Sequence, residues 1–222
     1  MSFSAEWDQR YKENTHLSIW PWSELVSLVR RHCRQLQGAR VLELGCGAGA
    51  NIPFFQSLGV QYHAMEGSRL MVRRLHDRFP ALAQTIAAAD FTVEQVFAPG
   101  FALIVDRASL THNSTSAIQN ALRLTWNALK PGAYFIGVDW FSTQYSEFER
   151  GDKDVDEYTR TNYPDGPFTG VGRVHFSDLP HLRALFSRFE VILIEEKVIR
   201  RNVPESESQL ASWNIVVRKP NV

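Results

Sequence analysis

Apolar and polar residues follow two alternating patterns along most of the chain. From Ala39 onward, short apolar runs alternate with longer stretches in which apolar residues recur at helical spacing. The short runs predict buried strands and the longer stretches predict amphipathic helices. The predicted strands are Arg40–Leu44, Gln61–Met65, Thr85–Ala89, Phe101–Val105, Tyr134–Val138, Val191–Ile194 and Asn214–Val217. The predicted helices are Asn51–Leu58, Ser68–Arg78, Ala117–Leu129 and Leu179–Phe186.

Capping and turn residues support these boundaries. Ser68 suits the N-cap of the second helix, Gly59 ends the first, and Lys130-Pro131-Gly132 stops the third. Strands that are buried on both faces and joined by helices form a parallel sheet covered on each side. The sequence therefore predicts an α/β fold in a single domain over residues 1–222.

Two segments lie outside this alternation. Residues 1–37 carry four Trp and Tyr side chains, of which Trp7 and Tyr11 are spaced to share one helical face. Residues 141–174 are rich in charge, Gly and Pro, and we expect them to be too irregular for the core. They follow a strand at the end of the sheet where open α/β folds bind ligands, so we predict a substrate-side cap. The alternative is a solvated, mobile connection.

Composition narrows the class of protein. The 222 residues are 44% hydrophobic and 22% charged, which is typical of a globular chain, and 24 Lys and Arg balance 24 Asp and Glu. The absence of net charge argues against nucleic acid or an anionic membrane as partner. The two cysteines and seven histidines lack the spacing of a disulfide framework or a metal site, so no metal is expected. Without a signal peptide or a long apolar run, we expect a soluble, cytoplasmic protein.

The motif that carries most information is Glu-Leu-Gly-Cys-Gly-Ala-Gly, which begins at Glu43 and closes the first predicted strand. Glycines at such a turn let a ligand approach the backbone. Gly45, Gly47 and Ala50 fit a dinucleotide fingerprint, with Glu66 about 20 residues further on. Glu43 argues against a dinucleotide, because its carboxylate would repel a pyrophosphate. It suits a ligand whose nearby part is cationic, such as the ammonium and sulfonium of S-adenosylmethionine.

With this loop and this order of elements, the chain from Arg40 to Val217 resembles the class I S-adenosylmethionine-dependent methyltransferases. The resemblance implies a Rossmann-like, doubly wound sheet of seven strands, mostly parallel with an antiparallel last strand, and an N-terminal helical lid over residues 1–37. It also implies that the glycine loop holds the methionine end of the cofactor, that Glu66 binds both ribose hydroxyls, and that Asp90 lies near the adenine. The implied cofactor-binding residues are Trp7, Tyr11, Glu43, Gly45, Cys46, Gly47, Glu66, Gly67, Ser68, Asp90, Phe91, Asp106 and Arg107.

Some of these residues also have a purely structural interpretation. The glycines could form only a tight turn, Asp90 could cap a helix, and Asp106 could pair with a neighbouring arginine. Cys46 is expected to fit the turn because it is small, and not to act as a thiol nucleophile.

Methyl transfer requires an aligned nucleophile and, for an oxygen nucleophile, a group that takes its proton. His112, on the loop after the fourth strand, is the candidate base; packing against the cofactor or capping a helix is the alternative. Asp139 ends the fifth strand on the ligand side and is a candidate to position a substrate hydroxyl or amine. His112 and Asp139 are therefore the predicted catalytic residues.

The sequence as a whole predicts a methyltransferase that acts on an oxygen or nitrogen of a small metabolite, for example a sugar or a secondary metabolite, as a monomer or homodimer. Asp106-Arg107-Ala108-Ser109 departs from the Asn/Asp-Pro-Pro-Tyr/Phe segment of N6-adenine DNA methyltransferases, which disfavours that reaction. The alternatives are an NAD-dependent oxidoreductase, which Glu43 disfavours, and a non-catalytic member of the fold.

Overall fold

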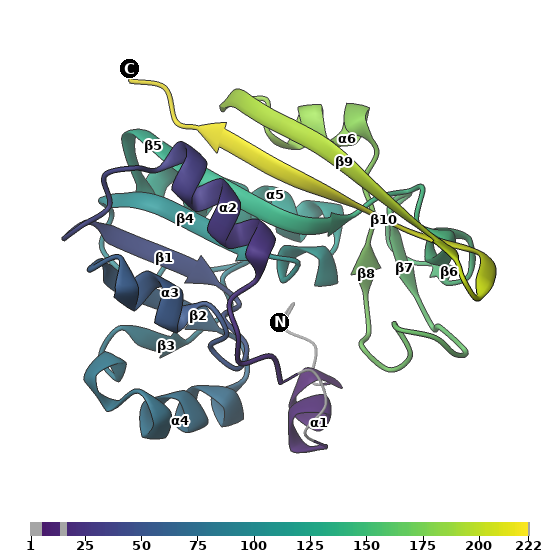
Figure 1. Cartoon of the computed structure of the whole chain (residues 1–222), viewed down its shortest axis with the longest axis horizontal. Coiled ribbons are helices and arrows are strands. Elements are labelled where there is room, and N and C mark those ends of the chain that lie inside the picture. The colour runs from purple at the N-terminus through teal and green to yellow at the C-terminus, as the bar shows by residue number, and fades with distance from the viewer. Residues whose placement is uncertain (1–5, 14–16, 222) are drawn as a thin grey trace.

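A seven-stranded sheet forms the centre of the computed structural model, which describes residues 6–13 and 17–221. The strand order is β3-β2-β1-β4-β5-β10-β9 (Figure 1). Strands β1 to β5 are parallel to one another, and β10 is antiparallel to both β5 and β9. The bounds are β1 Arg40–Leu44, β2 Gln61–Glu66, β3 Ile86–Ala88, β4 Phe101–Arg107, β5 Leu129–Phe141, β9 Glu190–Asn202 and β10 Glu205–Arg218. This topology confirms the predicted fold.

Helices cover both faces of the sheet. Side chains of α2 (Ser23–His32), α3 (Ile52–Ser57) and α4 (Arg69–Arg78) pack in one buried cluster, and those of α5 (Thr115–Ala128) and α6 (Leu179–Leu185) pack in another. The two clusters lie on opposite faces, because alternate residues of a strand point to opposite sides. Leu103 and Val105 of β4 belong to the first cluster, while Ile104 belongs to the second.

Local signals explain where the helices begin and end. The Ser68 hydroxyl accepts a hydrogen bond from the Met71 N–H at 3.1 Å, as expected of an N-cap. Helix α5 ends at Ala128, and the Lys130-Pro131-Gly132 segment belongs to the start of β5. Short elements complete the chain: α1 (Glu6–Lys12) and the 3-10 turns η1 (Pro80–Leu82), η2 (Leu110–His112) and η3 (Ser146–Glu149). Among the described residues, no helix has both the length and the apolar character needed to cross a membrane.

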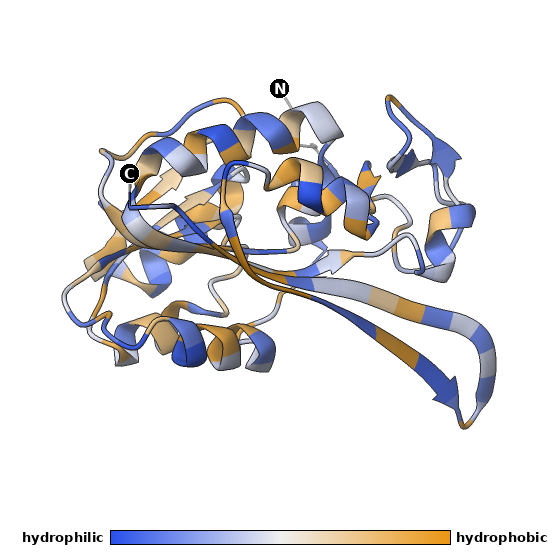
Figure 2. Ribbon diagram, turned by 90° about the horizontal axis from the view of Figure 1, so that it is seen from above, coloured by the Kyte–Doolittle hydropathy of each residue, from blue (hydrophilic) through white to orange (hydrophobic). Residues whose placement is uncertain are grey.

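The last two strands are much longer than predicted. β9 has 13 residues and β10 has 14, where the sequence predicted only residues 191–194 and 214–217. Cross-strand pairing continues from Val217–Val191 to Glu205–Asn202. The far half of this hairpin projects from the rest of the molecule (Figure 2).

Residues 141–174 are more ordered than the sequence predicted. They contribute β6 (Asp152–Lys153), β7 (Thr159–Thr161) and β8 (Val174–His175), which form an antiparallel three-stranded sheet. A separate cluster of buried apolar side chains holds this segment, hereafter called the cap, together. It contains Tyr145, Tyr163, Phe168, Val171, Val174 and Phe176, with Ala211 from the hairpin. The expectation that the segment is too irregular for a core is therefore wrong, because its scattered aromatic residues converge in space.

Candidate functional site

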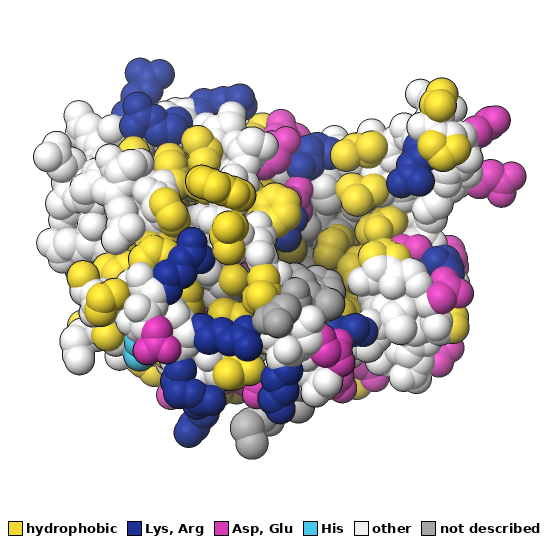
Figure 3. Space-filling view, turned by 60° about the horizontal axis from the view of Figure 1, so that its bottom comes forward, with side chains coloured by type: hydrophobic (Ala, Val, Ile, Leu, Met, Phe, Trp, Pro, Cys, Tyr) yellow, Lys and Arg dark blue, Asp and Glu magenta, His cyan; other side chains and the backbone are white. Residues whose placement is uncertain are grey.

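A cavity of about 480 Å³ lies at the carboxyl ends of β1, β2 and β4. Its walls also include α1 and the cap. Figure 3 shows hydrophobic side chains gathered between the main body of the molecule and the smaller lobe beside it. The volume is within the range of small-molecule sites. Of the predicted cofactor-binding residues, the lining contains Trp7, Tyr11, Glu43, Gly45, Cys46, Gly47, Glu66, Gly67, Asp90, Phe91 and Arg107.

The glycine loop contributes bare backbone to this cavity. Gly45, Gly47 and Gly49 all have positive φ, which favours glycine. A Cβ on Gly45 would overlap the Ser109 side chain, and one on Gly49 would overlap Leu75 and Ile52. A Cβ on Gly47 would instead point into the cavity, with only the Tyr11 hydroxyl oxygen within 4 Å, at 3.5 Å. The loop is thus both a tight turn and a cradle, and Gly47 is the glycine that keeps the cavity open.

Glu66 is held beside this loop by backbone hydrogen bonds. Its carboxylate accepts from the N–H of Gly47 and the N–H of Ser68, each at 2.9 Å, and the side chain is buried. Each carboxylate oxygen retains a second lone pair, so the fixed group can still accept from two hydroxyls. Ser68 itself is absent from the cavity lining, because its hydroxyl caps α4 and donates to Asp8. The place of Ser68 beside the adenosine stays a prediction, although its hydroxyl is engaged in capping α4.

Glu43 lines the cavity and is buried. Its two oxygens accept from the Tyr62 hydroxyl at 2.6 Å and the Asn51 amide at 2.7 Å. Burial raises the pKa of Glu43 to about 7, against the opposing effect of these two hydrogen bonds. A cationic group bound nearby would favour the ionised carboxylate. Burial also raises the pKa of the Cys46 thiol well above its ordinary value, which agrees with the expectation that Cys46 is not a nucleophile.

Asp90 and Phe91 follow β3 and both line the cavity. The Asp90 carboxylate accepts from the backbone N–H of Thr92 at 2.9 Å and from its hydroxyl at 2.6 Å. Asp90 therefore closes a turn, and no α-helix begins there. Its position beside an aromatic ring at the cavity wall is the arrangement that the sequence predicted for an adenine site.

Asp106 is not part of the cavity lining. Its carboxylate is fully buried, accepting from the indole N–H of Trp140 at 2.7 Å and from the backbone N–H groups of Ser109 and Leu110. Burial raises the pKa of Asp106 to about 7, although these hydrogen bonds oppose the rise. Asp106 thus stabilises the η2 turn, which favours its structural interpretation over a direct contact with the cofactor.

Asp139 also lies outside the lining, although Arg107 beside it is part of the wall. The Asp139 carboxylate pairs with Lys197 at 2.7 Å and with the Arg107 guanidinium at 3.2 Å. The same guanidinium stacks over Trp22, 3.5 Å from the ring centroid. Asp139 therefore positions Arg107, and its ion pairs favour a positioning role over direct catalysis.

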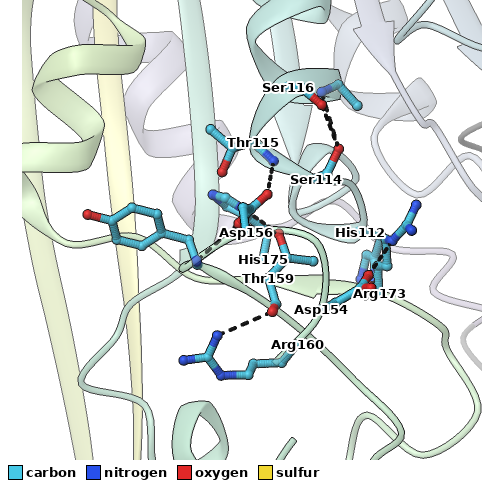
Figure 4. A network of polar contacts seen from close by, with 12 residues as sticks. His112, Ser114, Thr115, Ser116, Asp154, Asp156, Thr159, Arg160, Arg173 and His175 are labelled. Atoms are coloured by element: carbon cyan, nitrogen blue, oxygen red, sulfur yellow. Dashed lines mark hydrogen bonds and ion pairs between the residues drawn. The ribbon is translucent and has the colours of Figure 1, made fainter. Parts of the chain in front are cut away.

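His112 lines the cavity at the point where the glycine loop faces the cap. Its Nδ1 lies 3.0 Å from the backbone carbonyl oxygen of Arg173 (Figure 4). A carbonyl oxygen can only accept, so Nδ1 carries the proton in this contact and Nε2 is the basic atom of the neutral ring. The ring packs edge-on against Trp7, with centroids 4.8 Å apart, and against Phe141 at 6.0 Å.

Helix α1 spans the cavity between α4 and the cap. The Arg74 guanidinium donates to the backbone carbonyl of Tyr11, and Arg10 donates to the carbonyls of Thr169 and Gly170 in the cap. Trp7 and Tyr11 face inward from this helix, as their spacing predicted.

The other wall of the cavity contains apolar residues, most of them from the predicted cap segment, residues 141–174. They are Leu17, Phe141, Tyr145, Pro167, Phe168, Val171 and Leu210. Tyr163 is buried inside the cap and absent from the lining. The clustering of aromatic residues in residues 141–168 was the available signal, but Leu210 comes from a distant hairpin and had none.

Comparisons with known proteins agree with this geometry. Residues 41–132, which include the glycine loop, match a family model described as a methyltransferase domain. No curated protein matches the sequence. A solved structure of a methyltransferase dependent on S-adenosylmethionine from Methanosarcina mazei is 17% identical, with a TM-score of 0.68 over 92% of this chain and 99% of that chain. One from Mesorhizobium loti is 18% identical, with a TM-score of 0.64 over 87% and 96%.

A third solved structure is the Burkholderia thailandensis 1,6-didemethyltoxoflavin-N1-methyltransferase, with bound 1,6-didemethyltoxoflavin and S-adenosylhomocysteine. It is 17% identical, with a TM-score of 0.64 over 96% of this chain and 83% of that chain. At such low identity these structures share the fold, while the family model matches the sequence around the glycine loop itself. Residues 41–132 thus match a methyltransferase domain, and the chain has the fold of solved methyltransferases that depend on S-adenosylmethionine.

Proposed function

We propose that this protein is an S-adenosylmethionine-dependent methyltransferase that acts on an oxygen or nitrogen atom of a small, largely apolar and flat metabolite. The observation that carries the proposal is the division of one cavity into two unlike parts. One part has the Gly47 backbone with Glu43 and Glu66, and the other has rings such as Phe141 and Phe168. His112 lies between them.

The residues of the polar part fit the cofactor. The open backbone at Gly47 admits a ligand, the fixed Glu66 carboxylate has acceptor sites left for ribose hydroxyls, and Phe91 offers a ring beside the adenine position. Glu43 would favour the cationic methionine end. When bound, S-adenosylmethionine supplies an electrophilic methyl group for an in-line displacement.

In this proposal His112 accepts the proton of the nucleophile. The contact of Nδ1 with the Arg173 carbonyl assigns the basic lone pair to Nε2, which a hydroxyl or amine must reach for transfer. The packing of the ring between Trp7 and Phe141 restricts its rotation, so Nε2 is kept in one orientation.

The class of acceptor is inferred from the shortage of hydrogen-bond partners in the apolar part of the cavity. A sugar would need many hydrogen-bond partners, since unsatisfied hydroxyls are costly to bury. The walls here are mostly aromatic and aliphatic, so they favour a ring system with one ionisable group over the sugar named from sequence. The Burkholderia neighbour, which holds 1,6-didemethyltoxoflavin, supports a small-molecule acceptor.

Two measurements test the proposal. Titration calorimetry with S-adenosylmethionine should show binding, while NAD should not bind. Labelled methyl transfer should then be measured with a panel of phenols, aromatic amines and N-heterocycles, alongside a panel of sugars. Transfer confined to the sugars would refute the acceptor class. Cofactor binding without transfer to any member of a broad panel would favour the non-catalytic alternative.

A further inference from the structure

The free edge of the main sheet is a long strand. β9 is the last strand in the sheet order, and within residues 6–13 and 17–221 no further strand pairs with it. An edge strand presents a row of backbone donors and acceptors, and proteins that stay monomeric usually keep such edges short or interrupted. β9 has 13 residues, and its register with β10 is regular from Gln209–Arg200 to Val216–Leu193.

The outer part of β9 also exposes apolar side chains. Val198 is 40% exposed and Ile199 is 59% exposed, and the two lie on opposite faces of the strand. Both are β-branched, which favours pairing into a sheet. They lie on the hairpin that projects from the body (Figure 2).

Charges flank these two residues in a self-complementary order. Glu195-Glu196 precede and Arg200-Arg201 follow the segment Lys197-Val198-Ile199. If two copies of β9 pair antiparallel with Val198 opposite Val198, Glu195 faces Arg201 of the partner and Glu196 faces Arg200. The two-fold axis repeats both contacts, which gives four pairs of opposite charge, two on each face of the extended sheet.

Neighbouring registers are less favourable. If Lys197 or Glu196 pairs with its own copy at the two-fold axis, two like charges lie directly opposite each other. If Ile199 pairs with its own copy, Lys197 lies opposite Arg201 of the partner. Like charges directly opposite destabilise a strand pair. The order of charges therefore selects a single register, centred on Val198.

We propose that β9 is the interface of a symmetric homodimer in which the two main sheets join edge to edge across Val198. Nine residues from each copy, Ile194–Asn202, would be paired in this register. The interface uses none of the residues that line the cavity, so it is independent of the proposed acceptor.

Sedimentation equilibrium over a micromolar to submillimolar concentration range should show a monomer–dimer equilibrium. Arg201→Glu turns two of the four attractive pairs into repulsive ones, so it should raise the dimer dissociation constant by about tenfold or more. Adding Glu195→Arg reverses the order of the pair and should restore the dimer. Circular dichroism and cofactor binding should be unchanged in both variants, which confirms that the fold is intact.

Cysteine cross-linking tests the register itself. Val198→Cys would place two thiols at the two-fold axis, within the roughly 4.4–6.8 Å Cα separation that a disulfide requires. Ile199→Cys is the matched control, because in this register its copy lies two residues further along the strand. Mild oxidation should cross-link only the first variant, and both native cysteines are buried. A monomer at every concentration would overturn the proposal. The charges of β9 would then serve to prevent edge-to-edge pairing. A dimer insensitive to charge reversal, or equal cross-linking of both variants, would overturn it as well.

Discussion

Replacing Glu66 by Ala should separate cofactor binding from folding. The carboxylate is only 4% exposed and accepts from the N–H groups of Gly47 and Ser68. Hydrogen bonds to a charged group are worth about 1.5–3 kcal/mol, so loss of the ribose contacts should weaken S-adenosylmethionine binding roughly 10- to 150-fold. The two buried N–H groups would also lose their acceptor, at about 1–3 kcal/mol each. Since burial raises the pKa of Glu66, removing the buried charge recovers part of this cost.

The free energy of unfolding should therefore fall by about 2–4 kcal/mol, which a typical domain survives at low temperature. Calorimetric titration at low temperature gives the affinity, and urea denaturation without cofactor gives the stability. Glu94→Ala is the matched control, since Glu94 is an exposed glutamate outside the cavity lining and should change neither quantity. Unchanged cofactor affinity in a folded Glu66→Ala variant would refute the site assignment.

Four further predictions test other parts of the cavity. Gly47→Val should abolish cofactor binding in calorimetry, because the side chain would enter the cavity and φ is +51°; normal binding would mean that the loop is only a turn. His112→Ala should lower turnover by roughly 10²–10⁴ with little change in cofactor affinity, and a parallel loss of both would assign the ring to packing. Glu43, with a pKa of about 7, is protonated below that pH. Cofactor affinity should therefore increase as the pH rises from 6 to 8 and level off above pH 8. Glu43→Gln should remove this pH dependence. Phe168→Ala should raise the Michaelis constant for the acceptor while cofactor affinity is unchanged, and Tyr163→Phe, outside the lining, is its control.

The parts of the fold that follow from the sequence are those with strong periodicity. Each strand from β1 to β5 is a short apolar run, since both of its faces are covered, and its helix partner carries an apolar stripe. The periodicity of apolar residues did not predict the full hairpin, because the segment around Glu195 and Arg200 is polar or exposed on both faces. Its strand conformation comes from backbone pairing, for example Ile199 with Leu210, which leaves no apolar period in the sequence.

The difference between local patterns and long-range contacts also explains where the site departs from the sequence-based predictions. Carboxylates at strand ends were expected to face the ligand, and Glu43, Glu66 and Asp90 do lie in the cavity wall. Asp106 instead turns toward backbone N–H groups three and four residues later, and Asp139 turns toward Lys197, which is 58 residues away. A strand-end position places the Cα, but the side chain follows the nearest donors, and a distant lysine has no signature in the local sequence.

The cap both shapes the acceptor wall and fixes the candidate base. Asp156 in the cap accepts from the N–H of Thr115 at the start of α5 and from the hydroxyl of Thr159 in β7 (Figure 4). Although its burial opposes the effect, these hydrogen bonds lower the pKa of Asp156, so the anchor is ionised at neutral pH. The anchored segment leads to Arg173, whose carbonyl selects the tautomer of His112. A cap displaced from α5 would therefore open the apolar wall and release the Nδ1 proton contact together. In the proposed function, binding of an acceptor against Phe168 and orientation of Nε2 would thus both depend on one docked segment.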